Sequence, residues 1–218
     1  MITNVTKFDW KRVRLGPPNG LLLQSNRLLI PGDYSTNTGP FSSGFVTLND
    51  DSGEVDSWYL GGEYSMENYF VNEAQAVELL PNTNTIFINA RSNTTVRIGA
   101  YSHDGGLTFY QVNVLNTLVE PMGGCEGSTI YHSKSHQLFY TGLAGTSSVR
   151  TNLSLYTSED NGQKWTCMKT IWKGPSAYSS LTIMNDESIG VLYEGGNITA
   201  YDCLMFTVIY NQTEQKFY

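Results

Sequence analysis

The chain has 218 residues, of which 40% are hydrophobic, and this is long enough to bury a substantial core without requiring a second domain. Lysine and arginine number 13 against 20 aspartate and glutamate residues, so the formal net charge is -7 at pH 7. That charge argues against nucleic acid or an anionic membrane surface as the main partner, and any anionic ligand must be held by a local group of arginines.

The apolar runs of the chain also bear on membrane segments and secretory signals. No apolar run approaches the roughly 20 residues that span a bilayer, so we expect no transmembrane segment. The first ten residues lack the basic start and the apolar stretch of a secretory signal. Either the protein is cytosolic, or its true N-terminus precedes Met1.

Short β-branched and aromatic segments, separated by clusters of Gly, Asn, Asp and Ser, run along the whole chain. None of them holds a 3.6-residue apolar period for three turns. The predicted strands, in chain order, are 20–24, 44–48, 76–80, 85–91, 96–101, 136–140, 152–156, 180–184, 190–194 and 204–208. The predicted fold class is therefore all-β, built from hairpins.

Two segments share the pattern Ser-x-Asp-x-Gly-x-x-aromatic, Ser102–Phe109 and Ser158–Trp165, and they begin 56 residues apart, about the length of one four-stranded propeller blade. Aspartate can hydrogen-bond the backbone of a tight turn, glycine supplies positive φ, and the aromatic side chain fills the core of the blade. A degraded third copy is predicted at residues 49–53, with Trp58 displaced by two residues. An ordinary hairpin turn explains each copy alone, but the matching pair favours a β-propeller.

The cysteines and the glycosylation sequons bear on the compartment. Cys125, Cys167 and Cys203 lack metal-ligand spacing and are too few for a disulfide scaffold, so we expect them in the core, with room for one pair. Asn-x-Ser/Thr sequons begin at residues 4, 93, 152, 197 and 211, which suits a lysosomal or otherwise lumenal or secreted protein.

Four further segments carry candidate functional residues. Asn72–Gln75 is followed by Ile88–Arg91, Val149–Leu155 stands immediately before the second repeat, Gly174–Leu181 contains Tyr178, and Val191–Glu194 ends in a glutamate. These segments, in this order, resemble the sialidase (neuraminidase) family, and the two repeats resemble the family's Asp boxes. The residues of these segments are most similar to those of the animal lysosomal (sialidase-1) type.

The resemblance implies a six-bladed β-propeller in which three arginines grip the carboxylate of sialic acid. It covers roughly residues 16–210, so we expect residues 1–218 to form a partial sialidase catalytic propeller domain of about four blades. The family's first arginine and its acid/base aspartate precede anything that matches this chain. Asp9, Arg12 and Arg14 are poor substitutes, because no similar motif surrounds them, and the chain is expected to be a fragment.

Tyr178 and Glu73 are the residues that the resemblance assigns to catalysis. Sialic acid carries a carboxylate on its anomeric carbon, so a neutral nucleophile avoids a like-charge repulsion that an anionic one would meet. Tyr178 is the candidate nucleophile, and Glu73 is expected to accept its proton as attack begins. The structural alternative for Tyr178 is one packed loop tyrosine among 14.

Arg91 and Arg150 are the candidate substrate-binding residues, since each guanidinium offers a planar fork of donors to a carboxylate. A surface ion pair is the alternative for each. The resemblance implies that Glu194 orients the family's first arginine.

Other titratable residues are not assigned to the chemistry. Glu78 and Glu126 are expected to be solvated or structural. His103, His132 and His136 form no ligand spacing, and we expect no metal and no cofactor.

The resemblance implies an exo-α-sialidase that hydrolyses terminal α-linked sialic acids of glycoproteins, oligosaccharides and gangliosides by a retaining mechanism, with sialylated glycoconjugates as partners. Three alternatives remain open. They are a propeller that binds sialylated glycans without cleaving them, a trans-sialidase, and an unrelated propeller that uses the repeats only as turns. Convergence of Arg91, Arg150, Tyr178 and Glu73 on one face would argue against the last.

Overall fold

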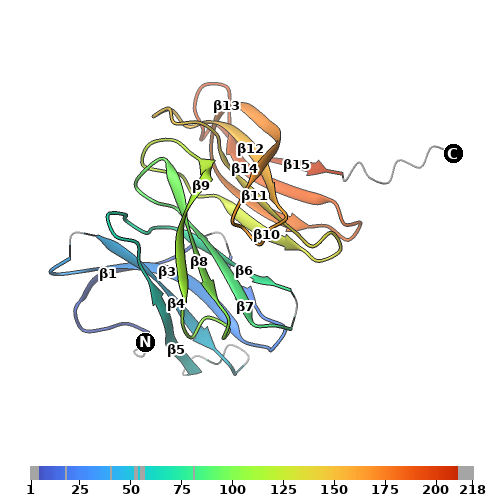
Figure 1. The fold of residues 1–218 in the computed structure, drawn as a ribbon. Coiled ribbons are helices and arrows are strands. Elements are labelled where there is room, and N and C mark those ends of the chain that lie inside the picture. The colour runs from blue at the N-terminus through green and yellow to red at the C-terminus, as the bar shows by residue number, and fades with distance from the viewer. Residues whose placement is uncertain are drawn as a thin grey trace.

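A computed structural model describes residues 5–17, 19–39, 41–51, 54, 57–80 and 82–210. These residues form 15 strands arranged in antiparallel sheets, which confirms the predicted all-β class (Figure 1). The sheets follow one another in chain order, from the blue N-terminal strands through the green ones to the yellow and red C-terminal strands.

The first sheet has the order β1-β3-β4-β5, and β2 also pairs with β3. Since β1 and β2 pair with different parts of the same strand, they form one inner strand that is interrupted at residues 16–20. The strands are β1 (Trp10–Leu15), β2 (Leu21–Leu22), β3 (Leu28–Thr36), β4 (Ser42–Asn49) and β5 (Trp58–Tyr64).

The second sheet is a four-stranded meander with the order β6-β7-β8-β9. Its strands are β6 (Ala74–Leu79), β7 (Thr85–Ala90), β8 (Val96–Ser102) and β9 (Gln111–Val119).

The remaining six strands follow the path β10 to β15, but they make two blades. The first part of β13 pairs with β12 as far as Pro175, and the part from Ser176 onward pairs with β14. The long strand β13 is thus the outer strand of the third blade and the inner strand of the fourth. The strands are β10 (Ser128–His132), β11 (Gln137–Leu143), β12 (Thr151–Ser158), β13 (Thr166–Ile183), β14 (Ile189–Gly195) and β15 (Cys203–Ile209). This arrangement is the expected partial propeller of about four blades.

Apolar side chains fill each junction between successive blades. Leu29 and Val46 of the first blade pack with Ile88 of the second, in a cluster that holds Ile98 and Ala100 as well. Corresponding clusters join the second blade to the third around Phe87 and Trp165, and the third to the fourth around Leu155 and Val191. Burying one such side chain contributes about 1.5–3 kcal/mol, so these clusters hold the blades in order.

The strand predictions were right in their positions and incomplete in their number. All ten predicted segments overlap strands, although 20–24 is too long because only Leu21–Leu22 pairs there. The sequence did not predict β1, β3, β5, β9, β10 or the first half of β13. Lysine and arginine in β1 and the Pro31-Gly32-Asp33 run in β3 break the expected pattern, and pairing with neighbouring strands overrides it.

The two complete repeats fold into the same hydrogen-bonded turn. Ser102 Oγ donates to Asp104 Oδ1 at 2.7 Å, and Gly106 N donates to Ser102 Oγ at 2.9 Å. The second copy repeats these contacts at 2.8 and 3.0 Å, from Ser158 and Gly162. The third predicted copy lies partly outside the described residues, at Ser52 and Gly53.

The cysteine prediction is wrong in part. Cys125 is buried, but Cys167 and Cys203 are exposed on strands, and all three are free thiols. Of the sequons, those at Asn93, Asn152 and Asn197 begin with exposed side chains, and those at residues 4 and 211 lie outside the described residues.

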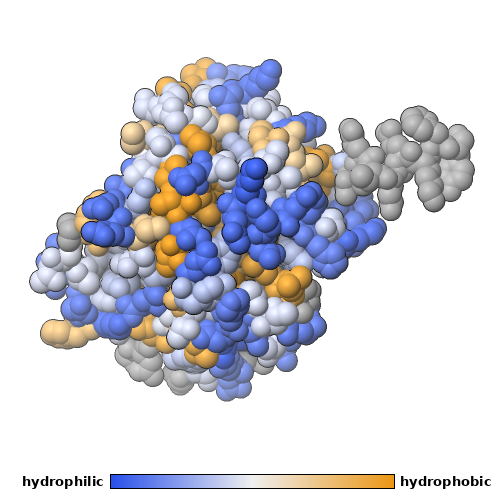
Figure 2. Space-filling model, in the orientation of Figure 1, coloured by the Kyte–Doolittle hydropathy of each residue, from blue (hydrophilic) through white to orange (hydrophobic). Residues whose placement is uncertain are grey.

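The surface is mixed in character. In the orientation of Figure 1, hydrophilic side chains surround a band of apolar ones (Figure 2). Within the described part of the chain, no helix is long and apolar enough to cross a membrane.

We predict that Gly162→Ala destabilises the fold by about 2–4 kcal/mol, because the residue has φ +89° and an added Cβ would lie 2.7 Å from the ring of Phe87. Gly145→Ala is the matched control. It has φ +94° but nothing within 4 Å of the added Cβ, so only the backbone cost of about 1–2 kcal/mol remains. Urea unfolding of both variants measures the difference, and equal losses would contradict the packing argument.

Candidate functional site

Glu73 and Arg91 are brought together by the pairing of β6 with β7. Glu73 immediately precedes β6 and Arg91 immediately follows β7, so both lie at the same end of one antiparallel pair. The pairing continues beyond the strands, because Asn72 N donates to Arg91 O at 3.0 Å and Arg91 N donates to Glu73 O at 2.8 Å. The backbone therefore fixes the relative position of these two side chains.

Tyr178 reaches the same place from the fourth blade. It lies on the inner part of β13, and its Oη donates a short hydrogen bond to Glu73 Oε1 although the residues are 105 apart in sequence. Burial, followed by the hydrogen bond to Glu73 and that residue's charge, raises the pKa of Tyr178 to about 12. The phenol is therefore neutral across the physiological pH range, with its proton directed at a carboxylate.

Arg91 is held by three hydrogen bonds to two partners. Its Nη1 donates to Glu73 Oε2 at 2.7 Å, and its Nε and Nη2 donate to the carbonyl of Gly123 at 3.1 and 2.9 Å. The next residue, Gly124, has φ +65°, and a Cβ there would lie 2.9 Å from Arg91 Cγ. Only glycine allows the backbone to approach the arginine this closely. The sequence prediction did not include this glycine pair, although two successive glycines between strands are a signal of a special turn.

Arg150 lies over Tyr178. It immediately precedes β12, and its carbonyl accepts a hydrogen bond from Ser176 N at 3.1 Å. Its Cζ is 5.8 Å from the centroid of the Tyr178 ring, and its Nη1 donates to Tyr201 Oη at 3.4 Å. Arg150 is thus half-buried at the site with much of its donor capacity unused by these contacts.

Glu194 makes a contact that the resemblance did not imply. It lies at the end of β14, and its Oε2 accepts a hydrogen bond from Tyr178 N at 3.1 Å. In the described structure the side chain therefore holds the backbone of the candidate nucleophile, where the prediction was a contact with an arginine.

Another charged group lies beside these residues. Arg14 of β1 donates from Nη2 to Asn72 Oδ1 at 2.9 Å and to Asp33 Oδ2 at 2.9 Å. Asp33 is 2% exposed, and burial raises the pKa of its carboxyl despite the bonds from Arg14. Arg14 was set aside in the sequence for lack of a motif. The pairing of β1 with β3 places it opposite Asp33, and its side chain also contacts Asn72 just before β6.

The residues set aside from the chemistry lie elsewhere or below the site. Glu78 Oε2 accepts from Gln24 N at 3.0 Å, at the far end of β6, and His103 stacks on Tyr110. Glu126 is buried beneath Tyr178, as a structural role requires. Among the described residues, no group of three or more His, Cys, Asp or Glu side chains is arranged to hold a metal ion.

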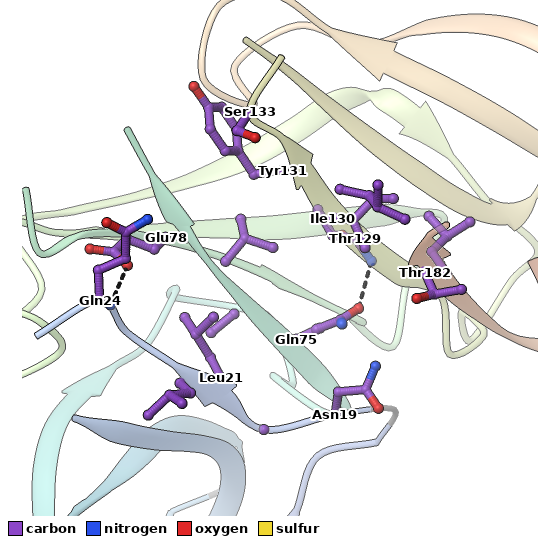
Figure 3. Close-up of a pocket in the computed structure, with 16 residues that line it drawn as sticks. Asn19, Leu21, Gln24, Gln75, Glu78, Thr129, Ile130, Tyr131, Ser133 and Thr182 are labelled. Carbon is purple, nitrogen blue, oxygen red and sulfur yellow. Dashed lines mark hydrogen bonds between the residues drawn. The ribbon is translucent and has the colours of Figure 1, made fainter. Parts of the chain in front are cut away.

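A cavity of 370 Å³ lies between the inner strands β2, β6, β10 and β13. Its walls include Gln75 and Leu181, which follow Glu73 and Tyr178 along their strands, but neither of those two residues (Figure 3). The cavity therefore extends away from the Tyr178–Glu73 contact and is separate from it.

The arrangement suits one kind of chemistry. A neutral phenol touches a carboxylate that can take its proton, and two guanidinium groups lie within reach of an anion placed over the ring. Tyr178, Glu73, Arg91 and Arg150 converge on one place, which the unrelated-propeller alternative does not predict.

Comparisons with known proteins agree with a propeller of the sialidase type. Residues 9–193 match the BNR repeat-like domain. The chain is 32% identical to sialidase-2 of Rattus norvegicus over 93% of its own length, and it spans 58% of that protein. Its fold is similar to that of a Hadza microbial sialidase, with a TM-score of 0.80 and 22% identity over 96% of this chain and 40% of the other. It is similar also to the intramolecular trans-sialidase of Ruminococcus gnavus, with a TM-score of 0.74 and 19% identity over 93% of this chain and 45% of the other.

The finer likeness to the lysosomal type stays a prediction. The family itself is shown, because the repeat domain covers most of the chain and the curated relatives are sialidases. The chain therefore belongs to the sialidase family and carries its BNR repeat-like domain.

Proposed function

We propose that the protein containing these 218 residues is an exo-α-sialidase that hydrolyses terminal α-linked sialic acids by a retaining mechanism, with Tyr178 as nucleophile and Glu73 as its base. The observation that carries the proposal is the hydrogen bond from Tyr178 Oη to Glu73 Oε1 across two blades. The proposed substrates are sialylated glycoproteins, oligosaccharides and gangliosides.

The first step is attack of Tyr178 Oη on the anomeric carbon. The bond from oxygen to that carbon forms, the bond to the departing glycosidic oxygen breaks, and the phenolic proton passes to Glu73 Oε1. Because the pKa of Tyr178 is raised to about 12, chiefly by burial, the attacking group is neutral and meets no repulsion from the substrate carboxylate. In the second step water attacks the same carbon, the bond from Tyr178 Oη to that carbon breaks, and the proton on Glu73 returns to the departing phenolate. The proton of the water passes to the group that protonated the glycosidic oxygen in the first step.

Arg91 and Arg150 are proposed to bind the substrate carboxylate. The guanidinium of Arg91 is already fixed by Glu73 and by Gly123, so it presents a preorganised positive charge. Arg150 is less constrained and lies over the Tyr178 ring, where an approaching carboxylate can draw its donors. Preorganised charges of this kind stabilise a transition state without reorganisation.

A general acid must protonate the departing oxygen, and a retaining glycosidase uses the same group later to activate water. The family segments recognised in this chain do not include that aspartate or the first arginine. A non-cleaving glycan-binding propeller and a trans-sialidase are the other outcomes of the tests below.

We predict that a 2,3-difluorinated sialic acid labels Tyr178 covalently. Fluoride leaves without a general acid, so the reaction reports the nucleophile and its base alone. Tyr178→Phe should abolish the mass gain of the peptide that contains Tyr178, and Glu73→Gln should slow labelling by about 10²- to 10⁴-fold. Intact-protein and peptide mass spectrometry measure both, and unchanged labelling of the Tyr178→Phe variant would overturn the proposed nucleophile.

For a natural linkage we expect the isolated 218-residue chain to be a poor catalyst. Release of an alcohol from a sialyl-oligosaccharide should be slower than release of a fluorogenic phenol by about 10²-fold or more, because the phenol needs little protonation. Rapid turnover of both substrates, lost on Tyr178→Phe, would contradict the assignment of the general acid outside this chain.

A further inference from the structure

Tyr178 lies on an irregular stretch of β13. Ser176 pairs with Gly195 of β14, and the next paired residue, Ser179, faces Tyr193. Three steps along β13 therefore match two along β14, which is a β-bulge. The bulge takes Tyr178 out of the ladder with β14, and Ser179 N lies on the free edge of this inner strand, as Leu181 N does, so both N–H groups beside the phenol need other acceptors.

Two carboxylates supply these acceptors. Tyr178 N donates to Glu194 Oε2 at 3.1 Å, and Ser179 N donates to Glu126 Oε2 at 2.9 Å. Glu194 belongs to β14 of the same blade, whereas Glu126 precedes β10 of the preceding blade. Consecutive amides at the candidate nucleophile are thus tied to two different blades.

The burial of the Glu126 carboxyl is energetically unfavourable. It is 2% exposed, and its Oε1 has no hydrogen-bond partner within the described part of the chain. A buried carboxyl with an unsatisfied oxygen costs free energy, so the position is maintained at the expense of stability. The one side-chain oxygen that is satisfied accepts from Ser179 N, the amide next to Tyr178.

The surroundings of Glu126 are strongly charged. Burial raises its pKa from 4.5 to about 7, the Ser179 amide and Arg97 lower it, and the charges of Glu73 and Glu194 raise it. The titratable and charged groups that interact with it are Glu73, Glu194, Arg97, Cys125 and Tyr140.

Ser128 provides a comparison on the same two strands. It is buried, and its Oγ accepts from Leu181 N at 2.9 Å. Leu181 pairs in regular register with Val191, beyond the bulge. Ser128 and Glu126 therefore make similar contacts with β13, but only that of Glu126 is at the bulge.

We infer that Glu126 is a positioning residue for the reaction: by accepting the Ser179 amide, it holds the β13 bulge in the one conformation that directs the Tyr178 phenol at Glu73, with Glu194 as the second anchor. This inference rests on the proposed role of Tyr178. The side chain of Glu126 does not touch the substrate and acts through the backbone alone.

Labelling by the difluorinated sialic acid tests the inference. Glu126→Met removes the acceptor without leaving a cavity, and it should lower the maximal labelling rate about tenfold or more with little change in the half-saturating concentration. Glu126→Gln keeps a carbonyl oxygen for Ser179 N and should retain most of the rate. Ser128→Ala should change the rate by less than about threefold, although it removes both the hydrogen bond from Leu181 N and the one that Ser128 Oγ donates to Gln75 Oε1 at 3.0 Å.

A measurement without ligand complements the labelling experiment. The ¹³Cζ signal of Tyr178, assigned by its loss in Tyr178→Phe, should move in Glu126→Met and stay in place in Ser128→Ala, because only the first change releases the bulge. An unmoved signal and an unchanged labelling rate in Glu126→Met would overturn the inference, as would equal effects of Glu126→Met and Ser128→Ala. Failure of the proposed function is seen separately, as labelling that survives Tyr178→Phe.

The buried carboxyl also predicts a pH dependence of stability. Because the folded pKa of Glu126 is raised above 4.5 to about 7, its stabilising contribution is complete below the unfolded pKa and is lost as pH rises through 7. The melting temperature of the wild type, relative to Glu126→Gln, should therefore fall between pH 5 and pH 8. A difference that stays constant over this range would show that Glu126 is not the group that titrates.

Discussion

The inner strands of the blades each have one edge without a neighbouring strand, and the backbone groups on these edges must find other partners. Side chains of the preceding blade provide them. Gln75 Oε1 accepts from Thr129 N at 2.6 Å (Figure 3). The Ser128 hydroxyl and the Glu126 carboxylate accept from the amides of Leu181 and Ser179. Blade order and blade spacing depend on these side-chain contacts, because no strand ladder joins the second blade to the third.

The site depends on the same contacts. Glu73 and Arg91 are carried by the second blade, Arg150 by the third and Tyr178 by the fourth, so no single blade contains the chemistry. A small rotation of one blade would separate the phenol from its carboxylate. Among the residues that tie inner strands together, Glu126 also sets the distance on which proton transfer depends, because its contact lies at the β13 bulge.

The charge of the molecule is organised around this region. The chain carries a net charge of -7, yet Arg91 and Arg150 both lie beside the Tyr178–Glu73 contact. Arg97 is 1% exposed and donates to Glu120 Oε2 at 3.1 Å and to the Cys125 carbonyl at 2.8 Å, below the site. The Arg97–Glu120 ion pair lies next to the turn of Gly123 and Gly124, which contacts Arg91. It therefore supports the placement of the Arg91–Glu73 ion pair.

Local patterns of the sequence predict most of the strand-forming segments and the repeat turns, and the resemblance of short segments to the sialidase family selects Tyr178, Glu73, Arg91 and Arg150 as candidates. The sequence did not reveal β1 or β3, whose charged and Pro-Gly residues are tolerated because neighbouring strands pair with them. The folded chain alone shows that Glu194 holds the Tyr178 amide, that Arg14 lies beside Asn72, and that Glu126 reaches β13 from another blade. These contacts join residues 16 to 58 positions apart, and strand pairing and blade docking bring them together, which no local pattern encodes.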